Sequence, residues 1–248
     1  VDAGAIGGIV NMKTKSALTR KGRHVTFQAG ESYNVWRKTF RPYGAVSYSD
    51  VFGASQKLGV LLTASYSETN KPRDNSNFVY EQTTDTNRPI WFNAGPWGED
   101  FTEHTRTGVS LRLDYKLTPT TTVYASLMYS DYDVSLDRRR GNISAPTAAN
   151  LVQVTDTVSE ARGQTFTYVQ TLIELNIKTL SIMLGGESHL FGAKLDFQGT
   201  VSPSKGYQVQ FNTPRTVAGV QLRQDRSISH NFVTLTQTGG PDIFDPRN

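Results

Sequence analysis

The sequence predicts an all-β protein: an antiparallel, up-and-down meander that forms a segment of a transmembrane β-barrel, as an open and curved sheet over these residues. Three observations lead to this fold class. Apolar and polar residues alternate with a period of two over long runs, prolines fall at the starts of those runs or between them, and short connections alternate with long ones. A period of two puts neighbouring side chains on opposite faces of a strand, so each run has one apolar face and one polar face.

The alternating runs define seven strands. The clearest one covers residues 109–117, where Val109, Leu111 and Leu113 alternate with polar residues. In chain order the predicted strands cover residues 24–33, 43–51, 58–68, 109–117, 122–133, 167–184 and 193–201. Most are about ten residues long, the length that a tilted strand needs to cross a bilayer. Prolines such as Pro42 and Pro119 lie where a missing N–H breaks no hydrogen-bond ladder.

The connections between these strands fall into two classes. Residues 51–57, 118–121 and 185–192 form short turns, whereas 69–105, 134–164 and everything from 202 onward are long. In a meander the short turns then share one rim and the long loops share the other, as in bacterial outer-membrane barrels. An eighth strand is expected after residue 202, either in 207–222 or in 231–237.

Composition excludes several classes of protein. The chain has 248 residues, 37% of them hydrophobic, with a mean hydropathy of -0.43 and no cysteine. No run approaches the roughly 18 apolar residues of a membrane helix, while a barrel strand needs apolar residues only at alternate positions. The net charge of +4 is small and its cations are dispersed, which argues against a nucleic-acid partner.

The first fifteen residues combine a glycine-rich turn with a strand-like run that ends in Thr14 and Lys15. This stretch resembles the last strand of the plug domain in TonB-dependent outer-membrane receptors. The alternative is an ordinary turn and strand. The residues that carry the resemblance, at the junction of plug and barrel, are Gly7, Gly8, Val10, Asn11, Lys13, Thr14 and Lys15. No initiator Met or signal peptide precedes them, so we expect the chain to be an excerpt.

The resemblance implies a domain division and a function. Residues 1–15 would end the plug, and 16–248 would form the first seven or eight strands of a 22-stranded barrel. The whole receptor would bind a nutrient outside the cell, such as a ferric siderophore, a vitamin or an oligosaccharide, and pass it to the periplasm. Its implied partners are the TonB complex, acting through the missing plug segment, and outer-membrane lipid with lipopolysaccharide. The alternatives are a plugless porin and a soluble all-β binding or adhesion module.

Two groups of residues are candidates for ligand contact. One is aromatic and lies in the long connection 69–105, where clustered rings suit either a stacked ligand or packing onto neighbouring loops. The other is a run of arginines, which suits carboxylate or phosphate groups but is also typical of a solvated surface. The candidate residues are Trp91, Phe92, Asn93, Trp97, Arg138, Arg139 and Arg140.

The polar faces of three strands are expected to point into the barrel, where they would contact the plug or water. A charged residue turned to lipid at the midplane costs about 2–4 kcal/mol, which fixes the register. The candidate lumen-facing residues are Arg112, Asp114, Lys116, Glu174, Asn176, Lys178, Lys194, Asp196 and Gln198. The four histidines are far apart and no nucleophile motif is present, so we expect no enzyme activity, no metal site and no cofactor.

Overall fold

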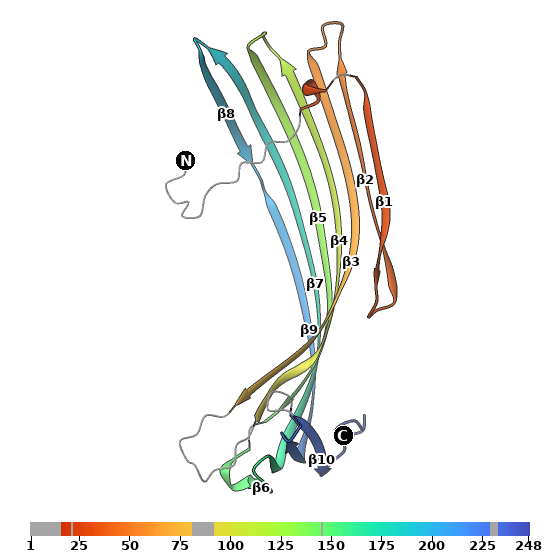
Figure 1. The fold of residues 1–248 in the computed structure, drawn as a ribbon, viewed down its shortest axis with the longest axis vertical. Helices are drawn as coiled ribbons and strands as arrows, with labels where there is room; N and C mark the ends of the chain where they lie inside the picture. Colours follow the sequence, from red (N-terminus) through yellow and green to blue (C-terminus); the bar gives the residue numbers. More distant parts are fainter. Residues whose placement is uncertain (1–15, 21, 81–91, 145, 229–232) are drawn as a thin grey trace.

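A computed structural model describes residues 16–20, 22–80, 92–144, 146–228 and 233–248. Over these residues the chain is all-β, antiparallel and up-and-down, which confirms the predicted fold class (Figure 1). The main path of the sheet runs β1-β2-β3-β4-β5-β7-β9-β10, and β6 and β8 also pair with β7. The strands are β1 (His24–Asn34), β2 (Thr39–Phe52), β3 (Leu58–Tyr80), β4 (Phe92–Lys116), β5 (Thr121–Ile143), β6 (Leu151–Gln153), β7 (Val158–Leu190), β8 (Ala193–Val201), β9 (Ser204–Asp225) and β10 (Thr234–Gly239).

The strands β8 and β9 act together as one partner of β7. β8 pairs with the end of β7 from Leu190 back to Ile182, and β9 continues from Thr179 to Val158. At the break between them the Leu180 N–H still donates to the Pro203 carbonyl, at 3.1 Å. β9 therefore contains the candidate eighth strand at 207–222, and β10 pairs with its last residues.

Several strands are much longer than predicted. The expected loops 69–105 and 134–164 are largely strand, because β3, β4, β5 and β7 continue far past the apolar runs. The expected turn 185–192 is also wrong, since β7 extends to Leu190 and leaves only Phe191 and Gly192 to turn the chain. Both have positive φ angles, 51° and 78°, as a two-residue type I′ hairpin turn requires.

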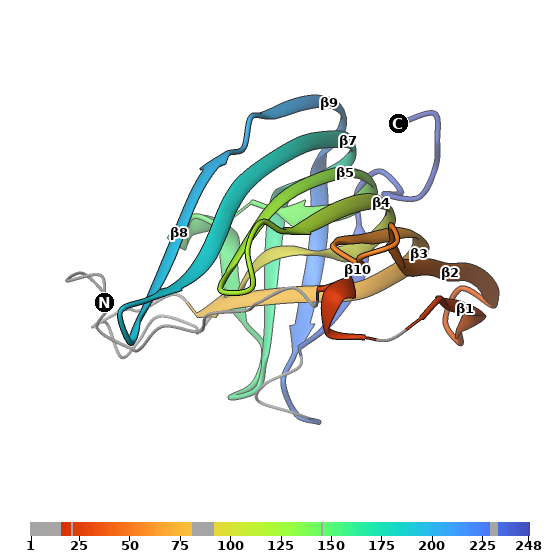
Figure 2. The ribbon, with the colours of Figure 1, turned by 90° about the horizontal axis from the view of Figure 1, so that it is seen from above.

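The sheet is open and curved. Within the described residues β1 pairs only with β2, and β8 only with β7, so both outer edges lack a strand partner. Figure 2 shows the strands as an arc with the short helix η1 (Ala17–Thr19) inside it. Helix η1 packs on Gly59 of β3, where a Cβ would lie 2.9 Å from Leu18 Cγ. In β3, the side chains on the concave face are therefore those of Gly59 and of every second residue counted from it.

The pairing register assigns each side chain to one face, because directly opposite residues of an antiparallel pair share a face. Near the short turns the convex face is apolar in four successive rows. The rows, read from β3 through β4 and β5 to β7, are Leu58, Tyr115, Val123 and Gly186; Val60, Leu113, Ala125 and Leu184; Leu62, Leu111, Leu127 and Ile182; and Ala64, Val109, Tyr129 and Leu180. Below, these four rows are called the apolar band.

A small buried core lies at the other end of the sheet. It joins β5, β6, β7 and β9 where the register of β7 against β9 shifts, and its members are Ile143, Leu151, Ala161, Phe166, Val217, Val220 and Leu222. Elsewhere the sheet is a single layer, so the large apolar side chains of the apolar band remain exposed: Leu184, for example, is 61% exposed.

Candidate functional site

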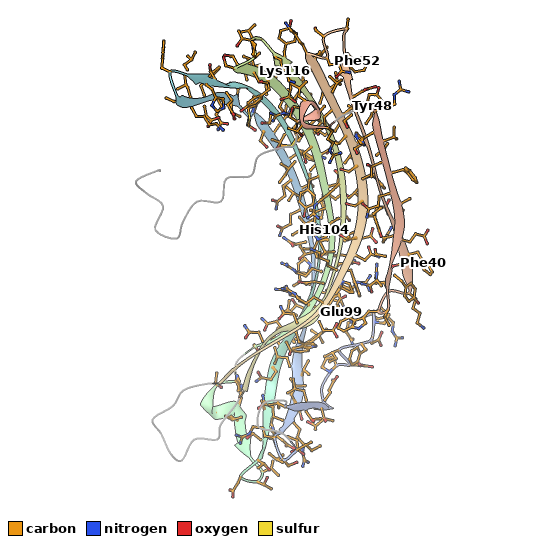
Figure 3. The ribbon with its side chains drawn as sticks, turned by 45° about the horizontal axis from the view of Figure 1, so that its top comes forward. Phe40, Tyr48, Phe52, Glu99, His104 and Lys116 are labelled. Atoms are coloured by element: carbon orange, nitrogen blue, oxygen red, sulfur yellow. The ribbon has the colours of Figure 1, made fainter. Side chains whose placement is uncertain are left out.

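The concave face near the short turns is polar and hollowed. A hollow of about 790 Å³ is lined by η1 and by residues of β4, β5, β7 and β8. Asp114, only 1% exposed, accepts a hydrogen bond from Arg112, and the Arg112 guanidinium lies 4.2 Å from the centroid of the Tyr124 ring. Figure 3 shows Lys116 and His104 on the face opposite to Tyr48 and Phe52, as the register requires.

Two of the three predicted lumen-facing triplets share this concave face. Arg112, Asp114 and Lys116 stand on β4, and Lys194, Asp196 and Gln198 stand on β8. Most of them line the same hollow, and Lys194 joins the group through Glu187 Oε2 at 2.8 Å. The structure therefore brings the two triplets together opposite the apolar band.

The third triplet lies on the other face. Glu174, Asn176 and Lys178 of β7 are opposite Ser135, Asp133 and Asp131 of β5, in the same column of side chains as Leu180 and Ile182. The expectation that all nine residues share one face is therefore wrong. The physical reason is a change of phase within β7. Ile173, Leu175 and Ile177 are odd-numbered, whereas Leu180, Ile182 and Leu184 are even-numbered, although the pairing with β5 continues without a shift.

The convex face changes character at this same level. The Asn176 side chain donates to Asp131 and Asp133, and Lys178 Nζ lies 3.6 Å from Asp131. Tyr129 is at the boundary, with its ring in the apolar band and its hydroxyl donating to Asp131 at 3.2 Å. The hydroxyl of Tyr66 donates to Glu68 in the same way. A ring on the apolar side and a hydroxyl on the polar side are typical of tyrosines at a membrane interface.

The three consecutive arginines do not form one cluster. They belong to β5 rather than to a loop, so alternation places Arg138 and Arg140 on the concave face and Arg139 on the convex face. Arg139 pairs with Asp137 at 2.8 Å. The sequence therefore predicted a single patch where the strand makes two opposite ones.

On the concave face, Arg138 and Arg140 contact a buried carboxylate, Asp100, which is 3% exposed. Asp100 accepts hydrogen bonds from Arg73 at 2.7 Å, Arg138 at 3.1 Å and Arg140 at 3.4 Å. Burial would raise the pKa of Asp100, but the hydrogen bond from Arg73 and the charges of Arg138 and Arg140 outweigh it, so this pKa is lowered. Arg73, Asp100, Arg138 and Arg140 form what is below called the arginine cluster.

The register explains why these residues meet. Arg73, Asp100 and Arg138 are directly opposite one another on β3, β4 and β5. Arg140 is one row further, opposite Gly98, where a Cβ would overlap the Arg139 carbonyl oxygen. Sequence reasoning missed Arg73 and Asp100 because both were assigned to a loop. A signal for these strands was present in the sequence, because basic residues at 71 and 73 and at 138 and 140 are two residues apart, the spacing of side chains on one face of a strand.

The aromatic candidates divide as follows. Trp91 lies outside the described residues, and Phe92 and Asn93 begin β4 opposite Tyr80 and Val79. The Trp97 ring packs on Phe166 with the ring centroids 5.7 Å apart, beside the small core. Packing is therefore the role that the structure gives to Trp97. The predicted junction residues Gly7, Gly8, Val10, Asn11, Lys13, Thr14 and Lys15 also lie outside the described part of the chain.

Two features are absent from the described residues. No group of three or more His, Cys, Asp or Glu side chains there is placed to hold a metal ion. None of the helices described is long and apolar enough to cross a bilayer.

The fold and the two-faced sheet define a class: an open, antiparallel all-β meander with an apolar band on its convex face. Comparison with models of known protein families and with curated proteins finds no match for this chain.

Proposed function

We propose that this chain is part of the barrel of a TonB-dependent outer-membrane receptor, which captures a nutrient outside the cell and delivers it to the periplasm. The observation that carries the proposal is the apolar band on the convex face with a polar concave face behind it. In β3 the apolar alternation from Leu58 to Tyr66 covers nine residues, close to the roughly 9–11 that a tilted strand needs to cross a bilayer. A soluble sheet of a single layer would have no reason to expose this band.

The height of the wall favours a receptor over a simple channel. β4 has 25 residues, which corresponds to about 80 Å of extended strand, whereas an outer-membrane apolar zone is only about 25 Å tall. The excess stands entirely on the side of the long connections, because the apolar band is next to the short turns. Such a tall wall would enclose a deep vestibule outside the membrane, where a ligand is captured before transport.

The protein would lie in a bacterial outer membrane, with lipid and lipopolysaccharide on its convex face. The resemblance of residues 7–15 to the end of a plug supports a gated lumen, with energy supplied by the TonB complex. In this role the chain binds and transports without bond chemistry.

Conductance in planar lipid bilayers tests the proposal against the plugless porin. The full-length protein should give no steady open-channel current, and a variant that lacks everything before Ser16 should conduct. A steady current through the intact protein would contradict the receptor and favour the porin. Protein that remains in the aqueous phase and does not enter the bilayer would contradict both membrane proposals and favour the soluble module.

A further inference from the structure

The arginine cluster carries an excess of positive charge. Three guanidinium groups surround one carboxylate, and each guanidinium has five N–H donors, far more than two carboxylate oxygens can accept. Arg73 keeps 64% of its side chain exposed, Arg138 30% and Arg140 24%. In addition, the Arg140 Nε is buried and has no hydrogen-bond partner. The exposed N–H groups of these guanidiniums therefore remain available to a ligand, on a wall that is already positively charged.

The excess extends over the surrounding concave wall. From the level of Arg106 to the level of Arg140, the concave positions of β3, β4, β5, β7 and β9 carry one carboxylate, Asp100. The cations on the same positions are Lys71, Arg73, Arg106, Arg138 and Arg140. Burial lowers the pKa of His104, and the positive charges of Lys71 and Arg106 lower it further, as expected where the wall is positive.

The convex face at the same levels has the opposite sign. Its cations on these strands are Arg139, Lys178, Lys205 and Arg215. They are outnumbered by the carboxylates Glu68, Asp74, Glu99, Glu103, Asp131, Asp133, Asp137 and Glu174. Arg41 of β2 pairs with Glu68 and Glu103, and the carboxylates still outnumber the cations when it is counted. The sheet is thus polarised through its thickness, and an anion approaching this part of the molecule is drawn to the concave side.

We propose that the arginine cluster is the binding site for a small, multiply charged anion whose carboxylate or phosphate groups are held by Arg73, Arg138 and Arg140. Guanidinium groups bind both kinds of oxyanion in a bidentate manner, which fixes orientation as well as charge. Asp100 orients the three arginines and limits their mutual repulsion. This inference rests on the proposed function, since it names the chemical class of the nutrient that enters the vestibule. A dissolved anion fits better than a lipid headgroup, because the cluster is on the face opposite to the apolar band.

Calorimetric titration of the detergent-purified full-length protein with pyrophosphate and with citrate tests the site. Loss of one charge-assisted contact should weaken binding by about tenfold or more, so Arg138→Gln and Arg140→Gln should each raise the Kd by at least that factor. Arg139→Gln is the matched control, because it removes the same charge from the adjacent position on the convex face. Its Kd should stay within about twofold of the parent value. If a concave variant fails to fold, Arg73→Gln, the most exposed of the three, replaces it.

Three results would overturn the inference. The first is that neither probe binds measurably. The second is that Arg139→Gln weakens binding as much as the concave variants do. The third is that the protein binds lipopolysaccharide micelles through Arg138 and Arg140 but does not bind the probes. Anion binding with the expected pattern, in a protein that conducts as an open pore, would contradict the receptor proposal and leave the anion site in place. The two proposals can therefore fail separately.

Discussion

At the scale of single residues, Asp100 holds the arginine cluster together. It is the only carboxylate among the concave positions at its level on β3, β4, β5, β7 and β9, and it accepts hydrogen bonds from three different arginines. Its removal would leave these cations facing one another on a partly buried wall. Asp100 is therefore the only side chain on these concave positions that offsets their positive charge.

The lowered pKa of Asp100 predicts acid-sensitive stability. Its folded pKa lies below the ordinary value of 3.8, so its contribution is complete above that value and is lost as the pH falls through the lowered pKa. At neutral pH, Asp100→Asn should reduce the free energy of unfolding by about 1–3 kcal/mol. In urea titrations of the micelle-bound protein, the difference between parent and variant should shrink on acidification. A difference that is constant with pH would contradict this account.

Gly98 is the second residue with a decisive local role. A Cβ there would overlap the Arg139 carbonyl, so Gly98→Ala must push β4 away from β5, at a cost of about 1–3 kcal/mol. Gly199→Ala on β8 is the matched control, because nothing lies within 4 Å of its added Cβ. Urea unfolding should show a clear loss for the first variant and little change for the second. Equal effects would mean that the close approach of β4 and β5 has no energetic weight.

At the scale of elements, the sequence predicts strands well where the two faces differ in solvent. Residues 109–117 alternate clearly because Leu111 and its convex neighbours are apolar while Arg112 faces the polar hollow, and β4 does cover nearly all of them. Past Thr107 and Asp131 the convex face is charged, so apolar alternation on that face no longer marks the strand. This is why the ends of β3, β4 and β5 were assigned to loops, and why Arg73 and Asp100 were missed.

Under the proposed membrane location, the change of phase in β7 predicts where this strand leaves the bilayer. These 248 residues contain no cysteine, so each variant adds the first cysteine to this part of the chain, at Lys178 or at Ile182, both exposed on the convex face. A water-soluble maleimide should label the Lys178→Cys variant in intact membranes and should not label the Ile182→Cys variant. Both should react after denaturation, which is the control. Equal labelling in membranes would show that Ile182 does not face lipid.

At the scale of the whole molecule, the sheet combines two structures along one set of strands. Next to the short turns it is apolar outside and polar inside. Next to the long connections it is acidic outside and basic inside. The segregation of short turns at one rim followed from the sequence, since alternate connections of a meander share a rim. The positive concave wall could not be predicted, because it depends on which residues of distant strands are opposite each other.

The central claim is that the convex face of the apolar band faces lipid, and adjacent residues of β5 test it most directly. Leu127 is convex and 41% exposed, and Met128 is concave and 50% exposed. Unfolding of the full-length protein from lipid vesicles should show that Leu127→Arg costs about 2–4 kcal/mol, whereas Met128→Arg costs less than about 1 kcal/mol. Equal and small costs for the two variants would contradict the account, because water would then surround both faces.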